Sequence, residues 1–195
     1  MEERYLRHDL AERIVHWVMA LSVLLLMGSG LNIRYPGLIP AGDMNGARSL
    51  HFISMYALVF SWLFHVYHTL AVERRTEIFG VSDLRNLPRT AAYYLFLADE
   101  PPAFVKYNPL QKLTYNLLWA LIFVQALTGF GLYWPARLMA VNELMGGLMA
   151  VRMLHDFLMY VFASFIIVHL YLVLTEDIRA LWAMFHGYYY RRSGG

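Results

Sequence analysis

The sequence contains no cysteine among its 195 residues, and only 15% of them are charged. The missing cysteine excludes disulfides, cysteine-ligated zinc, iron–sulfur clusters, covalent haem attachment of the c type and thiol catalysis. An average soluble domain is about 25% charged, so this chain does not fit that class. Its net charge of +2 is also too small for a nucleic-acid-binding surface. A hydrophobic content of 59% indicates a membrane protein, whose best metal ligands are its eight histidines.

Four segments are long and apolar enough to cross a bilayer as helices, which takes about 20 residues each. They are residues 14–33, 52–72, 113–136 and 153–175. No internal repeat or separate domain is evident between them. The sequence therefore predicts an all-α integral membrane protein, in which a single domain of residues 1–195 forms a four-helix transmembrane bundle.

Lysine and arginine are unequally divided between the segments that flank these spans. The N-terminus, the loop 73–112 and the C-terminus together hold twelve of the sixteen. Because positive residues favour the cytoplasmic side, we expect a multi-pass protein of a bacterial or archaeal inner membrane, with both termini and this loop in the cytoplasm. Residues 176–190 place apolar side chains at helical spacing, which predicts an amphipathic helix at the membrane surface.

The histidines of the spans follow a repeated spacing. His51 and His65 are 14 residues apart, as are His155 and His169, which is close to four helical turns, or about 21 Å. Each helix thus presents one imidazole near the outer surface and another near the cytoplasmic one. Matched histidines at two depths predict two b-type haems with paired axial imidazoles. His16 also lies at the inner depth. Spacing favours His65 over His16 as the partner of His169 but leaves the choice open, with His68 as a further candidate.

An arginine precedes three of the histidines by three residues. The pairs are Arg13 and His16, Arg48 and His51, and Arg152 and His155. In a helix this arginine lies one turn nearer the interface on the same face, where a guanidinium can pair with a haem propionate. The alternative is that these arginines only extend their charged groups into water at the helix starts. The threefold repetition disfavours this alternative.

Other histidine chemistries fit less well. A zinc site gathers three or four ligands at one point, whereas these histidines lie at two depths. A proton relay of the transporter kind would include buried carboxylates, and within the spans only Asp156 qualifies. A haem-free anchor, in which the histidines only pack or hydrogen-bond, is the remaining alternative.

Six motifs carry a resemblance to a known family. They are ERIVHW (12–17), GSG (28–30), ARSLHF (47–52), KYNPLQK (106–112), VRMLHDF (151–157) and IVHLY (167–171). In this order they resemble the gamma subunit of respiratory formate dehydrogenase, the di-haem cytochrome b of the formate dehydrogenase and nickel–iron hydrogenase group. The resemblance covers nearly the whole chain.

The resemblance implies a membrane anchor and electron-transfer subunit with two b haems, rather than a catalytic subunit. It implies an iron–sulfur partner and a catalytic oxidoreductase subunit on the outer, periplasmic face, and menaquinone or ubiquinone near the inner face. The implied haem pairs are His51 with His155 on the outer side and His16 with His169 on the inner side. His65 and His68 would then serve a proton path or packing.

The loop motif of the family lies near the inner haem and the quinone. The resemblance thus implies a quinone region at Asn108, Gln111 and Lys112, with a turn that starts the third span as the alternative for Asn108. Leu110 departs from the glycine that the family usually has, and Asp156 departs from a neutral residue. The same scaffold would serve a nickel–iron hydrogenase or a thiosulfate-type reductase fed by quinol, because nothing in the chain touches the primary substrate.

Overall fold

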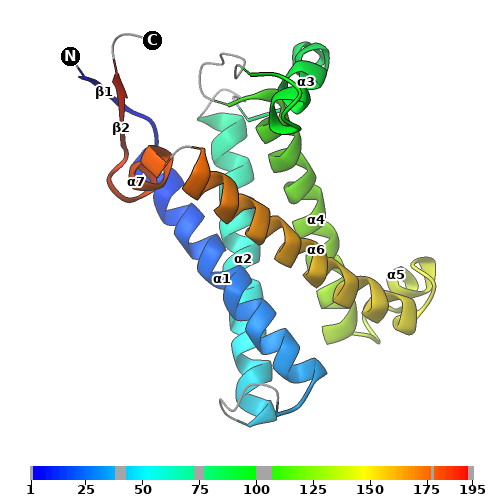
Figure 1. Ribbon diagram of the computed structural model, residues 1–195. Coiled ribbons are helices and arrows are strands. Elements are labelled where there is room, and N and C mark those ends of the chain that lie inside the picture. The colour runs from blue at the N-terminus through cyan, green and yellow to red at the C-terminus, as the bar shows by residue number, and fades with distance from the viewer. Residues whose placement is uncertain (1, 38–42, 73–76, 100–106, 177, 193–195) are drawn as a thin grey trace. The chain divides into compact units, whose positions relative to one another are not determined.

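The structure is a computed structural model that describes residues 2–37, 43–72, 77–99, 107–176 and 178–192, and these are nearly all helical (Figure 1). The helices are α1 (Leu10–Arg34), α2 (Met44–Ala71), α3 (Val81–Tyr94), α4 (Pro109–Tyr133), α5 (Met139–Leu144), α6 (Leu148–Thr175) and α7 (Ile178–His186). Strands β1 (Glu2–Leu6) and β2 (Tyr188–Arg192) form a two-stranded antiparallel ribbon. The helices α1, α2, α4 and α6 are long and apolar enough to cross a membrane. The predicted all-helical membrane class and its four spans are thus confirmed.

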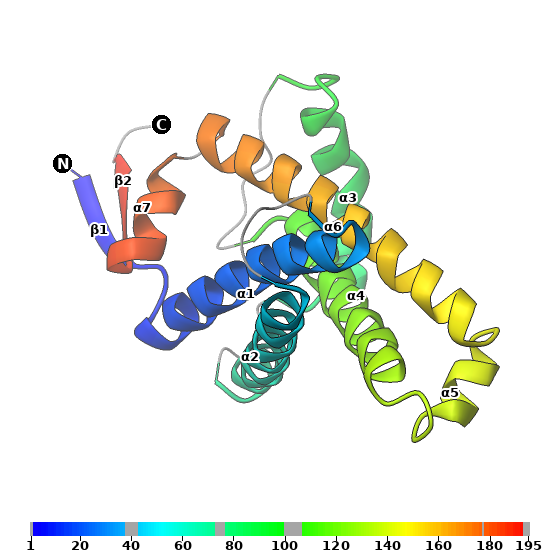
Figure 2. The same ribbon diagram turned by 90° about the horizontal axis from the view of Figure 1, so that it is seen from below.

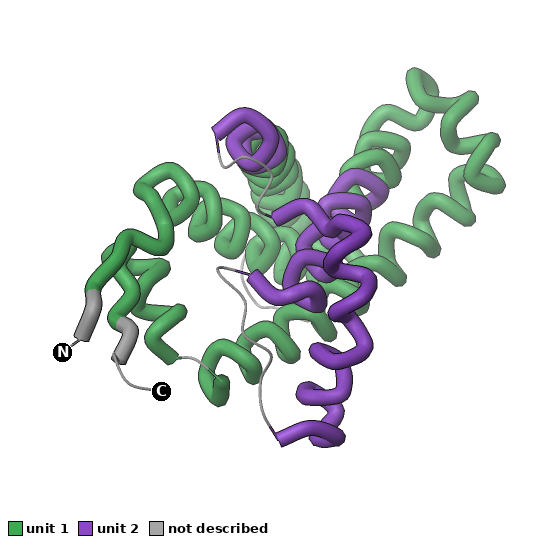
Figure 3. Tube along the Cα trace, turned by 90° about the horizontal axis from the view of Figure 1, so that it is seen from above, with its two compact units in different colours: residues 1–63, 125–195 green, residues 64–124 purple. Residues whose placement is uncertain are grey.

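The chain divides into two compact units (Figure 3). Unit 1 comprises residues 1–63 and 125–195, and unit 2 comprises residues 64–124. Unit 1 therefore contains α1, α5, α6, α7, the ribbon, most of α2 and the end of α4. Unit 2 contains the last turns of α2, all of α3 and the greater part of α4.

The transmembrane helices begin earlier than the apolar segments predict, and at α1, α2 and α4 polar side chains cap the start. At the start of α1, the Glu12 amide donates to Asp9 Oδ1 at 2.8 Å, and the Asp9 amide donates to Glu12 Oε2 at 3.3 Å. This reciprocal pair is a capping box. Helix α4 ends at Tyr133, three residues before the predicted end of its span, since the residue that precedes Pro135 disfavours helical geometry.

The two ends of the chain meet in unit 1 (Figure 2). Tyr5 lies opposite Tyr189 in the ribbon, with their ring centres 5.6 Å apart. Helix α7 confirms the predicted amphipathic helix, but it ends at His186, and residues 188–190 of the predicted segment belong to β2. It is tied to α1 because Trp17 Nε1 donates to the Met184 carbonyl at 3.1 Å. The ribbon is not predicted from sequence, because its two strands are nearly the whole chain length apart.

The loop 73–112 contains a helix, α3, that the hydropathy pattern does not predict. Asp83 starts it by accepting from the Gly80 amide at 2.9 Å. Arg74, Arg75 and Lys106, which contribute to the charge count of this loop, lie outside the described residues. The remaining residues of the KYNPLQK motif are described.

Candidate haem-binding site

His51 of α2 and His155 of α6 form the outer pair predicted from the sequence. Their ring centres are 6.3 Å apart, and the ring planes are inclined at 63°. A metal–imidazole bond is about 2 Å long, and the ring centre lies about 1.2 Å behind the bound nitrogen. Two imidazoles on opposite sides of one metal ion therefore have centres about 6.3 Å apart. The outer pair has the separation of two axial ligands.

His16 of α1 and His169 of α6 form a second pair with nearly the same separation. Their ring centres are 6.4 Å apart, with the planes inclined at 52°. Phe165 stacks on His169 at 5.8 Å, and Trp17 meets His16 edge-on at 5.3 Å. Helix α6 supplies one histidine to each pair, about 21 Å apart along its axis. The structure therefore brings together both of the pairs that the resemblance implies.

Two glycines lie against the rings of the outer pair. A Cβ atom added at Gly30 would lie 3.4 Å from His51 Cε1, and one added at Gly129 would lie 3.3 Å from His155 Cε1. The distance at Gly129 is tighter than ordinary van der Waals contact, and the distance at Gly30 is at its lower limit, so a side chain at either position would touch the imidazole. The missing side chains therefore let the backbones of α1 and α4 lie close to the two rings.

Two hydroxyl groups contact the same rings, and sequence reasoning missed both. Ser29 Oγ lies 3.0 Å from His51 Nδ1, and Thr128 Oγ1 lies 2.9 Å from His155 Nδ1. Each hydroxyl residue directly precedes the glycine that lies against the same ring. This repeated hydroxyl–glycine dipeptide is the signal that could have found them.

The donor set of the described residues favours two-ligand sites. Over the described ranges, no three histidine, aspartate or glutamate side chains lie close enough together to hold a metal ion. A structural zinc site needs three or four such ligands, whereas a bis-imidazole haem needs two. The residues present therefore fit the haem that the sequence predicts.

The three predicted propionate-binding arginines occupy different surroundings. Arg48 and Arg152 are exposed in the first turns of α2 and α6. Arg13 is engaged with backbone, because Nη1 donates to the Phe185 carbonyl at 2.6 Å and Nε donates to the Asp9 carbonyl at 3.2 Å. Propionate binding by these arginines stays a prediction.

Asp156, the acidic residue next to the outer ligand, has a partner within this chain. Arg34, in the last turn of α1, places Nε 3.3 Å from Asp156 Oδ2. The two side chains are 59% and 38% exposed, respectively. This ion pair therefore links the last turn of α1 to the third turn of α6 at the surface of unit 1.

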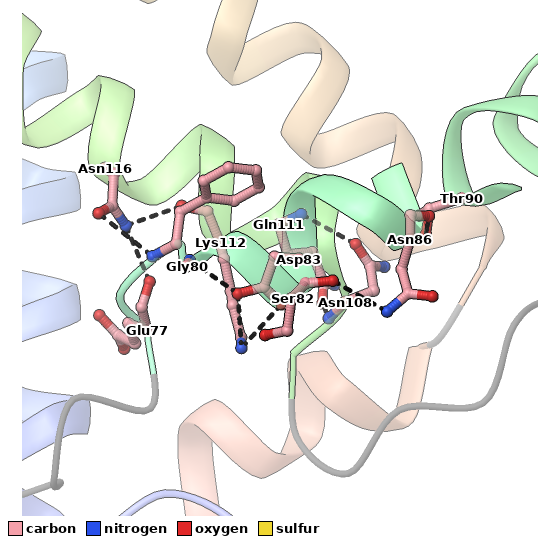
Figure 4. A network of polar contacts seen from close by, with 11 residues as sticks. Glu77, Gly80, Ser82, Asp83, Asn86, Thr90, Asn108, Gln111, Lys112 and Asn116 are labelled. Carbon is pink, nitrogen blue, oxygen red and sulfur yellow. Dashed lines mark hydrogen bonds and ion pairs between the residues drawn. The ribbon is translucent and has the colours of Figure 1, made fainter. Parts of the chain in front are cut away.

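The predicted quinone residues lie in unit 2, within a network of polar contacts (Figure 4). The Gln111 amide donates to Asn108 Oδ1 at 2.9 Å, and the Asn108 amide donates to Gln111 Oε1 at 3.0 Å. This capping box starts α4, with Pro109 as its first residue. Lys112 Nζ lies 3.1 Å from Asp83 Oδ1. These contacts match the helix-start alternative for Asn108, and a quinone contact stays a prediction.

His65, the other candidate inner ligand, has a carboxylate partner in unit 2. Its Nε2 lies 3.1 Å from Oε2 of Glu77, which also accepts from Thr69 Oγ1 at 3.4 Å. Glu77 is only 6% exposed. Hydropathy could not reveal this buried carboxylate, because Glu77 lies in a loop beyond the predicted span. His68 is buried and stacks on Phe64, with ring centres 6.0 Å apart.

Comparisons with known proteins point to one membrane cytochrome family. The profile described as "Prokaryotic cytochrome b561" matches residues 7–187. A relative from Azotobacter vinelandii is 31% identical over 188 residues, which cover 85% of this chain and 78% of that protein. Another from Cupriavidus necator is 28% identical, covering 85% and 77%. The names of both describe them as Ni/Fe-hydrogenase B-type cytochrome subunits.

A relative with a different name aligns over a larger share of its length than the two hydrogenase relatives do. This protein from Azospira oryzae is 28% identical over 197 residues, which cover 96% of this chain and 99% of the relative. Its name describes a subunit of a protein-methionine-sulfoxide reductase.

Proposed function

Because the chain belongs to the prokaryotic cytochrome b561 family, we propose that it is the membrane electron-transfer subunit of a respiratory oxidoreductase. The two histidine pairs, with ring centres 6.3 and 6.4 Å apart, carry this proposal. In it, His51 and His155 hold an outer b haem, and His16 and His169 hold an inner one. A haem bound by two imidazoles supplies one-electron transfer, because both axial positions are filled.

The chain's own residues prepare these two positions. The apolar helices surround each pair with a low-dielectric medium, and α6 sets the depth of both pairs because it supplies a ligand to each. We assign Arg48 and Arg152 to the propionates of the outer haem, since both are exposed one turn before their histidines. Arg13 also lies one turn before its histidine, His16, but its guanidinium group donates to backbone carbonyls.

The family and the relatives' names support a catalytic partner of the hydrogenase type. In the proposal, an iron–sulfur subunit and a catalytic subunit bind at the outer, periplasmic face, and both termini of this chain are cytoplasmic. Menaquinone or ubiquinone exchanges electrons with the inner haem, near Asn108, Gln111 and Lys112. A formate dehydrogenase partner would use the same arrangement, because in the proposal the catalytic subunit binds the primary substrate.

A second candidate partner is a reductase that receives electrons from quinol. The Azospira oryzae relative favours it, because that protein and this chain align over almost their full lengths. Electron flow would then run outward, from the inner haem to the outer one. The histidine pairs serve either direction equally well.

Haem content per polypeptide, measured on detergent-purified protein with a reduced-minus-oxidised spectrum, tests the proposal. We expect two b haems with separate midpoint potentials. Folded protein without haem, from cells supplied with haem, would overturn the proposal and favour a bare anchor. Identification of the catalytic subunit that co-purifies from native membranes would then distinguish a hydrogenase, a formate dehydrogenase and a reductase.

A further inference from the structure

Each ligand of the outer pair is bonded through Nδ1 to a hydroxyl group on another helix. Ser29 of α1 lies 3.0 Å from His51 Nδ1, and Thr128 of α4 lies 2.9 Å from His155 Nδ1. The two hydroxyl residues are buried, with exposed fractions of 5% and 0%. The helices that supply the hydroxyls therefore differ from those that supply the ligands.

Each hydroxyl group also has a backbone carbonyl within hydrogen-bond distance. Ser29 Oγ donates to the Leu25 carbonyl at 2.6 Å, and Thr128 Oγ1 donates to the Gln125 carbonyl at 3.0 Å. A hydroxyl group has a single proton and two lone pairs. When Nε2 of a neutral imidazole binds a metal ion, the ring proton is on Nδ1, so the hydroxyl oxygen accepts from Nδ1 and its own proton goes to the backbone carbonyl.

A proton on Nδ1 leaves the lone pair of the neutral imidazole on Nε2. The surroundings of His155 agree, because the Gln125 side-chain amide nitrogen lies 3.4 Å from its Nε2 and donates there. A metal ion needs the same lone pair. The hydroxyls at Nδ1 thus suit the tautomer that binds iron through Nε2 in both outer rings.

The glycine that follows each hydroxyl residue completes the arrangement. Gly30 and Gly129 have no side chain at the position where a Cβ would meet the ring at 3.4 or 3.3 Å. Each imidazole therefore has a hydroxyl at Nδ1 and bare helix backbone beside Cε1. Two separate helices, α1 and α4, present the same pair of features to the two rings.

We propose that Ser29 and Thr128 are positioning residues of the outer haem, which fix the tautomer of its ligands and lower its reduction potential. This inference rests on the proposed haem-binding function. An acceptor at the distal nitrogen of a metal-bound imidazole orients the ring and makes it a stronger electron donor. Stronger donation stabilises ferric over ferrous iron, so loss of a hydroxyl raises the midpoint potential.

The test uses purified full-length protein with Ser29→Ala or Thr128→Val, the second of which keeps the side-chain shape. Haem content, a spectroelectrochemical titration and the low-spin EPR spectrum are measured. We expect two haems per chain in both variants. One midpoint potential should rise by up to about 59 mV, which is a tenfold change in the equilibrium constant of a one-electron reduction. The other potential should stay unchanged. The EPR signal of the haem whose potential rises should shift.

Matched controls separate this role from general packing. Thr128→Ser keeps the hydroxyl and should keep the wild-type potential. Ser164→Ala and Thr175→Val remove hydroxyls that donate to the Tyr160 and Tyr171 carbonyls on the exposed side of α6, and both potentials should stay unchanged.

Unchanged potentials and EPR signals in both hydroxyl-free variants would overturn the positioning role while leaving the haem proposal standing. The same holds if Thr128→Ser shifts the potential as far as Thr128→Val does. If Thr128→Val loses the outer haem, retention of that haem by Thr128→Ser supports the role, and its loss contradicts it. A wild-type protein without haem would instead defeat the proposed function itself.

Discussion

His16 faces His169 with a ring-centre distance of 6.4 Å, and this relationship bears on which histidine completes the inner pair. Spacing alone leaves His65 as a competitor, but the imidazole of His65 lies 3.1 Å from the buried carboxylate of Glu77. The contacts of the two candidates thus differ in kind. One faces another imidazole, and the other has an acidic partner.

The first prediction concerns these candidates. Replacing His16 or His169 with alanine should remove one haem and leave the other, because each supplies an axial ligand. His65→Ala should retain both haems, and so should His186→Ala, which alters an exposed residue of α7. Haem content per polypeptide and the number of midpoint potentials provide the measurement. Loss of a haem from His65→Ala, with both retained in His16→Ala, would reverse the assignment.

The second prediction concerns the space beside the outer ligands. Gly129→Leu should abolish the outer haem, and Gly129→Ala should weaken its binding by about 1–3 kcal/mol, the usual cost of overpacking, because the added Cβ presses on His155. Gly28 is the matched control, since nothing lies within 4 Å of a Cβ added there. Haem retention during detergent washing compares the three variants. Equal retention by Gly129→Leu and Gly28→Ala would contradict the prediction.

The third prediction concerns the ion pair of unit 2. Lys112 and Asp83 lie 3.1 Å apart, with side chains only 22% and 11% exposed. Lys112→Ala should therefore lower the free energy of unfolding by about 1–3 kcal/mol, since it leaves a mostly buried carboxylate without its charged partner. Thermal unfolding of the purified protein measures this effect.

The control for that pair is Arg89→Ala, which removes an exposed charge of α3 and should change the unfolding temperature little. The haem content of Lys112→Ala should equal that of the wild type. If quinone reduction falls in Lys112→Ala while stability is unchanged, the residue acts at the quinone and the stabilising role is wrong.

The fourth prediction concerns the surface ion pair of unit 1. Arg34 and Asp156 are 59% and 38% exposed, so water and salt weaken their attraction. Arg34→Ala should cost at most about 1 kcal/mol of stability, and both haems should remain. A denaturation series at low and high salt checks this, because the small effect should shrink further at high salt. Loss of the outer haem would show that the pair positions His155 instead.

Some features of the candidate site were predictable because they depend on local patterns. Hydropathy alone identifies the four spans, and the 14-residue spacing places His155 and His169 on one face of α6. Helix starts are less predictable, since they depend on caps such as Asp9 with Glu12, which lie outside the apolar runs. The same holds for Asn108 and Gln111, whose loop position fits either a ligand site or a helix cap.

The membrane class, the number of spans and the histidines available as ligands can be read from the sequence, because apolar runs and helical periodicity are properties of neighbouring residues. Which side chains meet depends on the tertiary structure. Ser29 reaches His51 across 22 residues, and Thr128 reaches His155 across 27. Such bonds join different helices, so they depend on how those helices pack and rotate against one another. Burial of Glu77 beside His65 has the same origin, because the loop returns to the end of α2 only in the folded chain.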